Sequence, residues 1–178
     1  LLSQAEHDEN AYLVLVTTSS LLADKVKKEL VLQTKKLERS DIIKKCLSKN
    51  CYAFIVKSIE EGLDVSNRFA PEHMEIITKD ANSLVNKVMN AGALFLGPWT
   101  PEAMGDYIAG PNHVLPTGGT ARFFSPLGVY DFLKRTSLIS FSQKGLTALA
   151  SPVIDFATEE GLTAHANAVK IRLEKGKK

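Results

Sequence analysis

Apolar runs alternate with amphipathic stretches along the first part of the chain, and this alternation predicts an α/β fold. Runs rich in aliphatic and β-branched residues predict buried strands, and between them apolar residues recur at helical spacing. The predicted strands are residues 12–18, 52–56, 74–78 and 93–96. The predicted helices are residues 19–37, 41–48, 59–69 and 80–90, the last with Asp80 as its N-cap. Strands separated by such helices favour a mostly parallel, incomplete Rossmann-like sheet with helices on both faces.

The pattern changes at residue 97. Residues 97–128 are rich in Gly and Pro, so we expect no regular elements there, although their aromatic residues indicate an ordered and functional segment. Helical patterns return at residues 129–135, 142–160 and 162–174. We therefore expect a boundary near residue 127, between an α/β domain of residues 1–127 and a helical segment of residues 128–178.

Composition narrows the class of protein. Hydrophobic residues make up 44% of the 178 residues, which suffices for a buried core. Lys and Arg total 22 against 20 Asp and Glu, so charge gives no argument for binding nucleic acid or an anionic membrane. No apolar run reaches the roughly 20 residues that span a bilayer, and no secretory leader is visible, so we expect a cytoplasmic protein. Its opening residues lack a loose leading segment, which favours a fragment of a longer protein.

The two cysteines, Cys46 and Cys51, are interpreted as packing residues. A single C-x4-C pair without a second pair is weak evidence for zinc, and a free Cys is usually buried.

Each of the four histidines lies in a short polar run beside another potential ligand or an acid. Imidazole binds metals and transfers protons near neutral pH, and a neighbouring carboxylate tunes both properties. The four runs pair Gln4 with His7, Glu72 with His73, Asp106 with His113, and Glu160 with His165. Taken singly, the first, second and fourth runs fit an exposed helix end or surface turn better than a site. Together they predict one polar site built from four segments.

The loop of residues 105–119 is the strongest of these signals. It carries Asp106 and His113 on a backbone constrained by Gly and Pro, and Gly118-Gly119 permits close approach to a ligand. Neither a P-loop nor a dinucleotide-binding glycine fingerprint occurs in the chain. Two imidazoles, a carboxylate and a weak amide oxygen would suit Zn²⁺, with Mn²⁺ or Co²⁺ as substitutes. Glu72, His73 and Glu160 would then remain for proton transfer or substrate contact.

These motifs, in this order, resemble histidinol dehydrogenase. The resemblance is carried by residues 1–7, 66–73, 105–119 and 160–165 and extends over essentially the whole chain. It concerns only the C-terminal part of that enzyme, whose nucleotide-binding half would lie upstream of Leu1. The NAD-contacting residues are therefore expected outside this chain.

The resemblance implies a zinc- and NAD-dependent oxidation of L-histidinol through L-histidinal to L-histidine, the last step of histidine biosynthesis. It uses two NAD⁺ and one zinc per site. The implied zinc ligands are Gln4, His7, Asp106 and His165, and the implied substrate contacts are Gln4, His7, His73, Asp106, Glu160 and His165. His73 and Glu72 match the family's two proton acceptors, for the alcohol and aldehyde steps respectively. Members of the family form homodimers. The helical segment of one subunit would therefore supply Glu160 and His165 to the active site of its partner. His113 would be a neighbour of the active site.

Two alternatives stay open. The chain as given would be a catalytically inactive fragment that keeps only metal binding or dimerisation. A zinc hydrolase with the same ligands and Glu72 as its base is a third interpretation.

Overall fold

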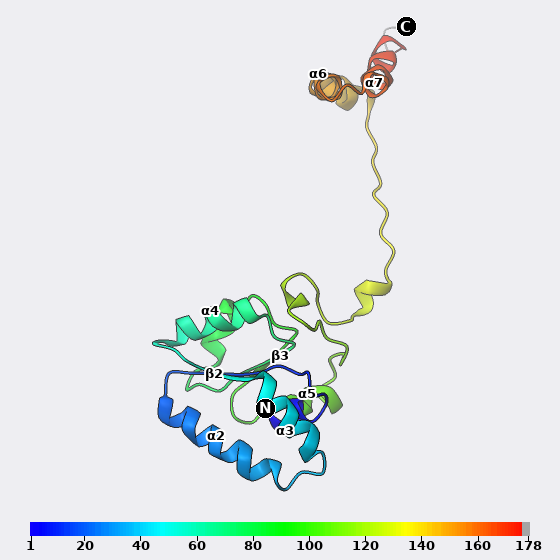
Figure 1. Cartoon of the computed structure of the whole chain (residues 1–178). Coiled ribbons are helices and arrows are strands. Elements are labelled where there is room, and N and C mark those ends of the chain that lie inside the picture. The colour runs from blue at the N-terminus through cyan, green and yellow to red at the C-terminus, as the bar shows by residue number, and fades with distance from the viewer. Residues whose placement is uncertain (176–178) are drawn as a thin grey trace. The chain divides into compact units, whose positions relative to one another are not determined.

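The protein, a computed structural model, is described for residues 1–175 and divides into two compact units, residues 1–132 and the residues from 133 onward. Each unit is considered by itself. The first alternates strands with helices and the second contains two helices (Figure 1). This confirms the predicted α/β class with C-terminal helices. The domain boundary predicted near residue 127, with the roles assigned to each side, stays a prediction.

The first two strands form a parallel pair. β1 (Leu13–Thr17) pairs along its whole length with β2 (Cys51–Ile55). A parallel pair requires a long crossover, which α2 (Ser20–Thr34) and α3 (Ser40–Asn50) supply. The hydroxyl of Ser19 caps α2 by accepting a hydrogen bond from the backbone of Leu22.

Helices cover both faces of this pair. α4 (Ile59–Phe69) lies on the side opposite α2 (Figure 1). Gly62 lets α4 approach closely, because a Cβ there would lie 3.3 Å from Cγ1 of Val16. On the α3 side, Ala5, Leu13, Ile43 and Cys46 form a buried cluster, and α1 (Leu2–Ala5) contributes the first of them. Cys46 is buried as predicted, whereas Cys51 is only half-buried, at the rim of the same cluster.

The other two strands form a second parallel pair, so the predicted parallel pairing is present but is divided between two small sheets. β3 (His73–Ile76) pairs with β4 (Ala93–Leu96), and no strand pairing joins this pair to the first among the described residues. A hydrophobic pattern identifies strands but does not determine which edges pair. The second pair has two different faces because successive side chains alternate. Met74 and Ile76 join a buried cluster with Leu63 and Leu84, while His73 and Glu75 face the other way.

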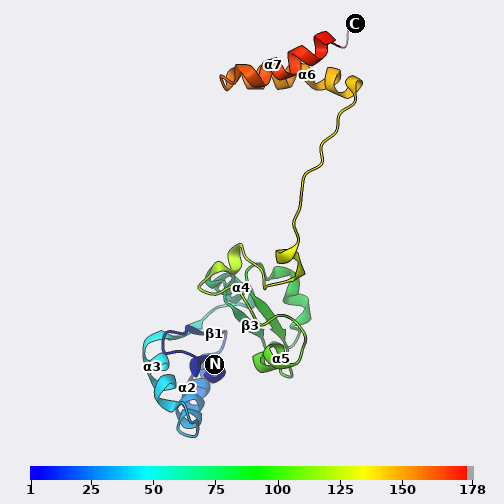
Figure 2. The same ribbon diagram turned by 90° about the vertical axis from the view of Figure 1, so that its right-hand side faces the viewer.

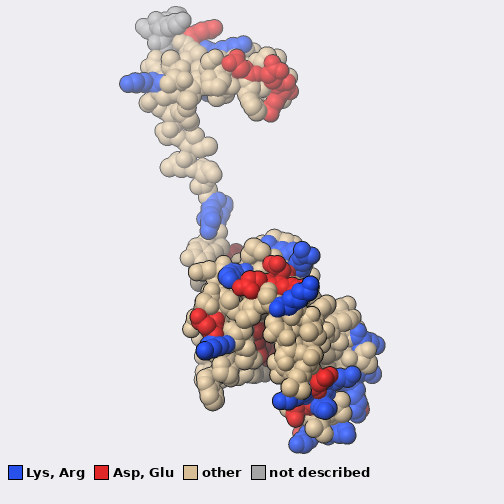
Figure 3. All heavy atoms as spheres, turned by 90° about the vertical axis from the view of Figure 1, so that its left-hand side faces the viewer, with Lys and Arg blue, Asp and Glu red and all other residues tan. Residues whose placement is uncertain are grey.

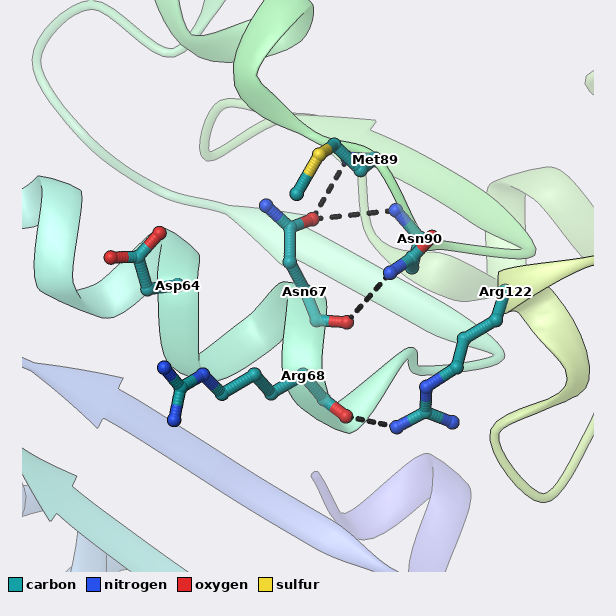
Figure 4. Close-up of a pocket in the computed structure, with 6 residues that line it drawn as sticks. All are labelled: Asp64, Asn67, Arg68, Met89, Asn90 and Arg122. Atoms are coloured by element: carbon teal, nitrogen blue, oxygen red, sulfur yellow. Dashed lines mark hydrogen bonds between the residues drawn. The ribbon is translucent and has the colours of Figure 1, made fainter.

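Residues 80–90 do not form the predicted α-helix. They contain a short 3-10 helix, η1 (Asn82–Lys87), and Asp80 accepts a hydrogen bond from Ser83 without capping an α-helix. The reason is a contact with another helix. The buried side chain of Asn67, on α4, accepts hydrogen bonds from the backbone of Met89 and Asn90 (Figure 4). It also donates one to the carbonyl of Lys87. Backbone groups that would continue a helix are bound by this side chain instead.

Replacing Asn67 with Ala is therefore expected to destabilise the full-length protein by about 1–3 kcal/mol, because it leaves partly buried backbone groups without these partners. Urea unfolding measures the change. The matched control is Asn86→Ala, an exposed Asn in η1 that should shift the midpoint little. Equal midpoints for both variants would show that the Asn67 contacts contribute nothing.

The Gly- and Pro-rich segment contains regular elements that the sequence did not predict. α5 (Glu102–Tyr107) follows Pro101, and η2 (Thr120–Arg122) follows Gly119, whose φ is +81°. Both are single short turns, too brief to produce a periodic hydrophobic pattern. The guanidinium of Arg122 connects η2 to α4 by donating a hydrogen bond to the carbonyl of Arg68 (Figure 4). It also donates one to the carbonyl of Gly119.

The helical pattern predicted for residues 129–135 corresponds to a shorter 3-10 helix, η3 (Val129–Phe132), at the end of the first unit. In the second unit, α6 (Gln143–Glu159) begins after Ser142, whose hydroxyl caps it, and α7 (Thr163–Lys175) follows a turn at Gly161. The two helices lie against each other (Figure 2), and their buried residues are the small Ala150, Ala157 and Ala166. Small side chains allow two helices to approach closely.

The surface carries both signs of charge. On the face shown in Figure 3, Lys and Arg lie among Asp and Glu side chains, which agrees with the near-balanced composition. In the described part of the chain, no helix is both long and apolar enough to cross a membrane.

Candidate functional site

The polar face of the β3–β4 pair is the floor of the candidate site. His73 and Glu75 face the same side, and α5 packs over them through Gly105. A Cβ at Gly105 would lie 2.6 Å from Cε1 of Phe95, so only glycine allows α5 this close to the ring. Glu75 also binds α5 directly, because its Oε1 accepts a 3.0 Å hydrogen bond from the backbone N–H of Glu102. The Gly105 approach and this bond bring Asp106 over His73.

His73, Glu102 and Asp106 form a cluster in which Glu102 is buried and the other two residues are half-buried. Nε2 of His73 lies 3.6 Å from Oδ1 of Asp106 and 3.9 Å from Oε1 of Glu102, and the three side chains are 12%, 9% and 10% exposed. Within the described residues, neither ring nitrogen of His73 makes a hydrogen bond. Donor atoms of the three residues lie within 4.8 Å of one another.

This donor set fits a divalent cation. A buried imidazole with unsatisfied nitrogens beside two carboxylates offers ligands that suit zinc. Among them Asp106 was predicted as a zinc ligand, and His73 and Glu102 were not.

His113 lies on the outer side of Asp106. Its Nδ1 is 3.3 Å from Oδ1 of Asp106, and its side chain is 63% exposed. Burial opposes ionisation of Asp106, but hydrogen bonding with Glu102 and His113, and the charges of His73 and His113, hold the pKa of Asp106 below its usual value. Asp106 is therefore suited to remain an anion, the form that binds a cation.

The turn that carries Gln4 and His7 is attached to this cluster. The backbone N–H of His7 donates to the carbonyl of Gln4, so the two residues share one turn that starts in α1. Next to Gln4, the hydroxyl of Ser3 donates a 2.9 Å hydrogen bond to Oε2 of Glu102. The structure thus brings the first sequence motif beside the second and the third. Gln4 is half-buried and His7 is exposed.

Glu72 lies immediately before β3 with a half-buried side chain. Its carbonyl accepts a 2.8 Å hydrogen bond from the backbone of Ala93, and Gly92 is needed beside it because a Cβ there would lie 2.6 Å from that oxygen. Glu72 is thereby fixed at the edge of the sheet next to His73.

The fourth motif belongs to the second unit. Glu160 ends α6, Gly161 turns the chain with φ +73°, and His165 lies in the first turn of α7. Both side chains are exposed. Their relation to the other three motifs, like the predicted role of every site residue, stays a prediction.

Glu102 is the site residue that the sequence interpretation missed. A signal was present: Glu102 precedes Asp106 by four residues, which places two carboxylates on one face of a helix. The four-residue spacing of Glu102 and Asp106 predicted nothing by itself, because the Gly- and Pro-rich segment was not expected to be helical.

A separate hollow of about 330 Å³ lies beside α4 and is lined by Asp64, Asn67, Arg68, Met89, Asn90 and Arg122 (Figure 4). The side chain of Asn67 accepts a hydrogen bond from the backbone of Met89, and the side chain of Asn90 donates one to the carbonyl of Asn67. The Arg122 guanidinium donates one to the carbonyl of Gly119. We interpret this hollow as the place where hydrogen bonds hold α4 against the neighbouring segments, and not as a reaction site.

Comparison with known proteins shows which protein family the chain belongs to. The family model described as histidinol dehydrogenase matches residues 1–173. Histidinol dehydrogenase from Bacillus cereus is 50% identical over 177 residues, which is 99% of this chain and 41% of that protein. The Heliobacterium mobile protein of the same name is 51% identical over 174 residues, 98% of this chain and 41% of its own length.

A solved structure is similar as well. The crystal structure of histidinol dehydrogenase from Elizabethkingia anophelis matches with a TM-score of 0.89 and 32% identity, over 99% of this chain and 41% of the other. The chain thus spans about 41% of the length of these relatives. Because the family match covers nearly every residue, the chain belongs to the histidinol dehydrogenase family.

Proposed function

We propose that this chain is the part of a zinc- and NAD-dependent histidinol dehydrogenase that carries the two proton-transfer residues and the four zinc ligands. The full protein would oxidise L-histidinol through L-histidinal to L-histidine. The observation that carries the proposal is the His73–Glu102–Asp106 cluster, which joins a proposed base (His73) to a proposed zinc ligand (Asp106), in a chain about half identical to histidinol dehydrogenases along its whole length. Because the chain spans 41% of those relatives, catalysis is assigned to the full protein.

Gln4, His7, Asp106 and the His165 of a second copy would hold the zinc ion. Asp106, an anion attached to the same cluster as the Gln4–His7 turn, supports this set. When bound, zinc supplies a Lewis acid that orients the substrate, and NAD⁺ supplies the hydride acceptor. The residues that contact NAD⁺ are expected outside this chain.

His73 is proposed as the base of the first oxidation. It accepts the proton of the substrate hydroxyl while the carbon that bears this hydroxyl transfers a hydride to NAD⁺. A neutral imidazole suits this step near neutral pH, and its unpaired, buried nitrogens leave it ready to bind a substrate group.

Glu72 is proposed as the base of the second oxidation. Its carboxylate takes a proton from the water that attacks the aldehyde carbon. Adjacent residues on an extended strand point to opposite sides of the sheet. Glu72 lies before β3, so this alternation does not determine the direction of its half-buried side chain. Two bases of different chemistry side by side suit two successive proton transfers.

A homodimer is proposed as the working unit, with Glu160 binding the substrate amine and His165 the zinc in the partner's site. Residues 133–141 and the two C-terminal helices expose large apolar side chains, such as Leu138 (96%), Ile139 (77%) and Phe156 (71%). Apolar surface of this kind is typical of a protein interface. The exposed Glu160 and His165 are then available to a second copy.

The direct test uses the full-length protein. NADH formation from L-histidinol should depend on zinc: removal by a chelator should abolish it, and added Zn²⁺ should restore it. Absence of NADH formation from the zinc-loaded protein would contradict the proposal. Hydrolysis of an ester or amide by that protein would favour the zinc hydrolase.

The alternative is a catalytically inactive fragment whose remaining properties are metal binding and dimerisation. The observation in its favour is the 41% coverage of the relatives. An upstream coding region in frame that supplies an NAD-binding domain would exclude it.

A further inference from the structure

We propose that Glu102 is a positioning residue of the dehydrogenase, held by Ser3 and orienting the imidazole of His73 toward the substrate hydroxyl. The inference rests on the proposed function, because it takes His73 as the base of the first oxidation. No comparison and no sequence motif assigned a role to Glu102.

The Glu102 carboxylate is buried and its position is fixed from two sides. Its side chain is 10% exposed, which is uncommon for a Glu without a partner. The hydroxyl of Ser3 donates a 2.9 Å hydrogen bond to Oε2. On the other side, the backbone N–H of Glu102 donates to Glu75, which anchors the residue to the strand that carries His73. Oε1 lies 3.9 Å from Nε2 of His73, and the Glu102 side chain also shares a hydrogen bond with Asp106.

The ring of His73 is packed in place but, among residues 1–175, is not held by a hydrogen bond. Both ring nitrogens are buried without a hydrogen bond within the described residues. The contact with Phe95, 5.9 Å between ring centroids and tilted by 38°, limits where the ring can move but does not select the direction of Nε2. Of the two carboxylates near Nε2, Asp106 is the proposed zinc ligand. Glu102 is therefore the carboxylate available to the imidazole.

The distance from Nε2 of His73 to Oε1 of Glu102 is 3.9 Å, longer than a hydrogen bond. Catalytic hydrogen bonds are often long in the absence of substrate and shorten in the complex. A carboxylate that binds one nitrogen of a His fixes which nitrogen faces the reaction. By binding Nε2, Glu102 would thus fix the tautomer and the orientation of the His73 ring.

The test compares Glu102→Ala and Glu102→Gln in the full-length zinc-loaded enzyme, with L-histidinol and with L-histidinal as substrates. Removing the carboxylate should lower kcat for histidinol by about 10- to 100-fold, the usual effect of losing a partner that orients a functional His. Oxidation of histidinal, whose proposed base is Glu72, should fall much less. Glu102→Gln keeps an acceptor oxygen at the same reach and should recover most of the loss. The control is Glu60→Ala, which removes an exposed Glu of α4 outside the cluster.

Each outcome decides the matter. Unchanged kcat in Glu102→Ala, equal losses on both substrates, or no recovery in Glu102→Gln would overturn the positioning role. Loss of zinc from Glu102→Ala would overturn it in favour of a metal ligand. If Glu102→Ala fails to fold, Ser3→Ala removes only the hydroxyl that holds Glu102 and should give a smaller loss with the same preference for histidinol. Failure of the wild-type protein to form NADH would instead reject the proposed function.

Discussion

Replacing His73 with Asn in the full-length enzyme is expected to lower the rate of histidinol oxidation by about 10²- to 10⁴-fold, the usual contribution of a positioned general base. Asn has nearly the shape of the imidazole's inner part but cannot accept the alcohol proton. Because the side chain lies against Phe95 and two carboxylates without a hydrogen bond, its loss should cost little stability. Initial rates of NADH formation, at saturating NAD⁺ and histidinol, measure the effect.

The matching variant is Glu72→Gln, which should have the opposite substrate preference. It should slow the oxidation of histidinal more than the first hydride transfer from histidinol, because Glu72 is the proposed base for water attack. Circular dichroism and zinc content of both variants should match those of the wild type. A His73→Asn enzyme that oxidises histidinol at the wild-type rate would remove His73 from its role as base.

The helices and strands were predictable where local pattern agrees with the tertiary environment. α4 has the predicted bounds of residues 59–69, and β4 has those of residues 93–96. The prediction failed at residues 80–90, because Asn67, more than ten residues away in sequence, binds the backbone there. Helical propensity is local information, and a buried amide from another helix can override it.

The candidate site was predictable in its residue types but not in its arrangement. Of the residues in the four polar pairs, His73 and Asp106 lie in the cluster, and Ser3 links α1 to Glu102. That all four pairs form one site stays a prediction. Glu102 was missed because α5 is only six residues long and lies among Gly and Pro. Its relevance comes from burial and from its neighbours, which appear only when β3, α5 and α1 are placed together.

Mixed dimers are expected to show whether His165 acts in the site of its own chain or in that of its partner. A His165→Ala chain and a His73→Asn chain should each be nearly inactive alone. If His165 acts in trans, a dimer of the two has one site with both defects and one intact site. Purified through two different tags, that dimer should have about half the wild-type activity, as expected when a two-fold dimer keeps one of two sites.

The reciprocal dimer is the control and should give the opposite result. A chain that carries both His165→Ala and His73→Asn, paired with a wild-type chain, places one defect in each site if His165 acts in trans, so both sites should fail. If His165 acts within its own chain, the same dimer keeps one intact site and the dimer of single variants has none. The exposed His165 at the start of α7 allows either arrangement, so the two measurements together decide between them. Activity in the reciprocal dimer and none in the first would reject the exchange of the helical segment between subunits.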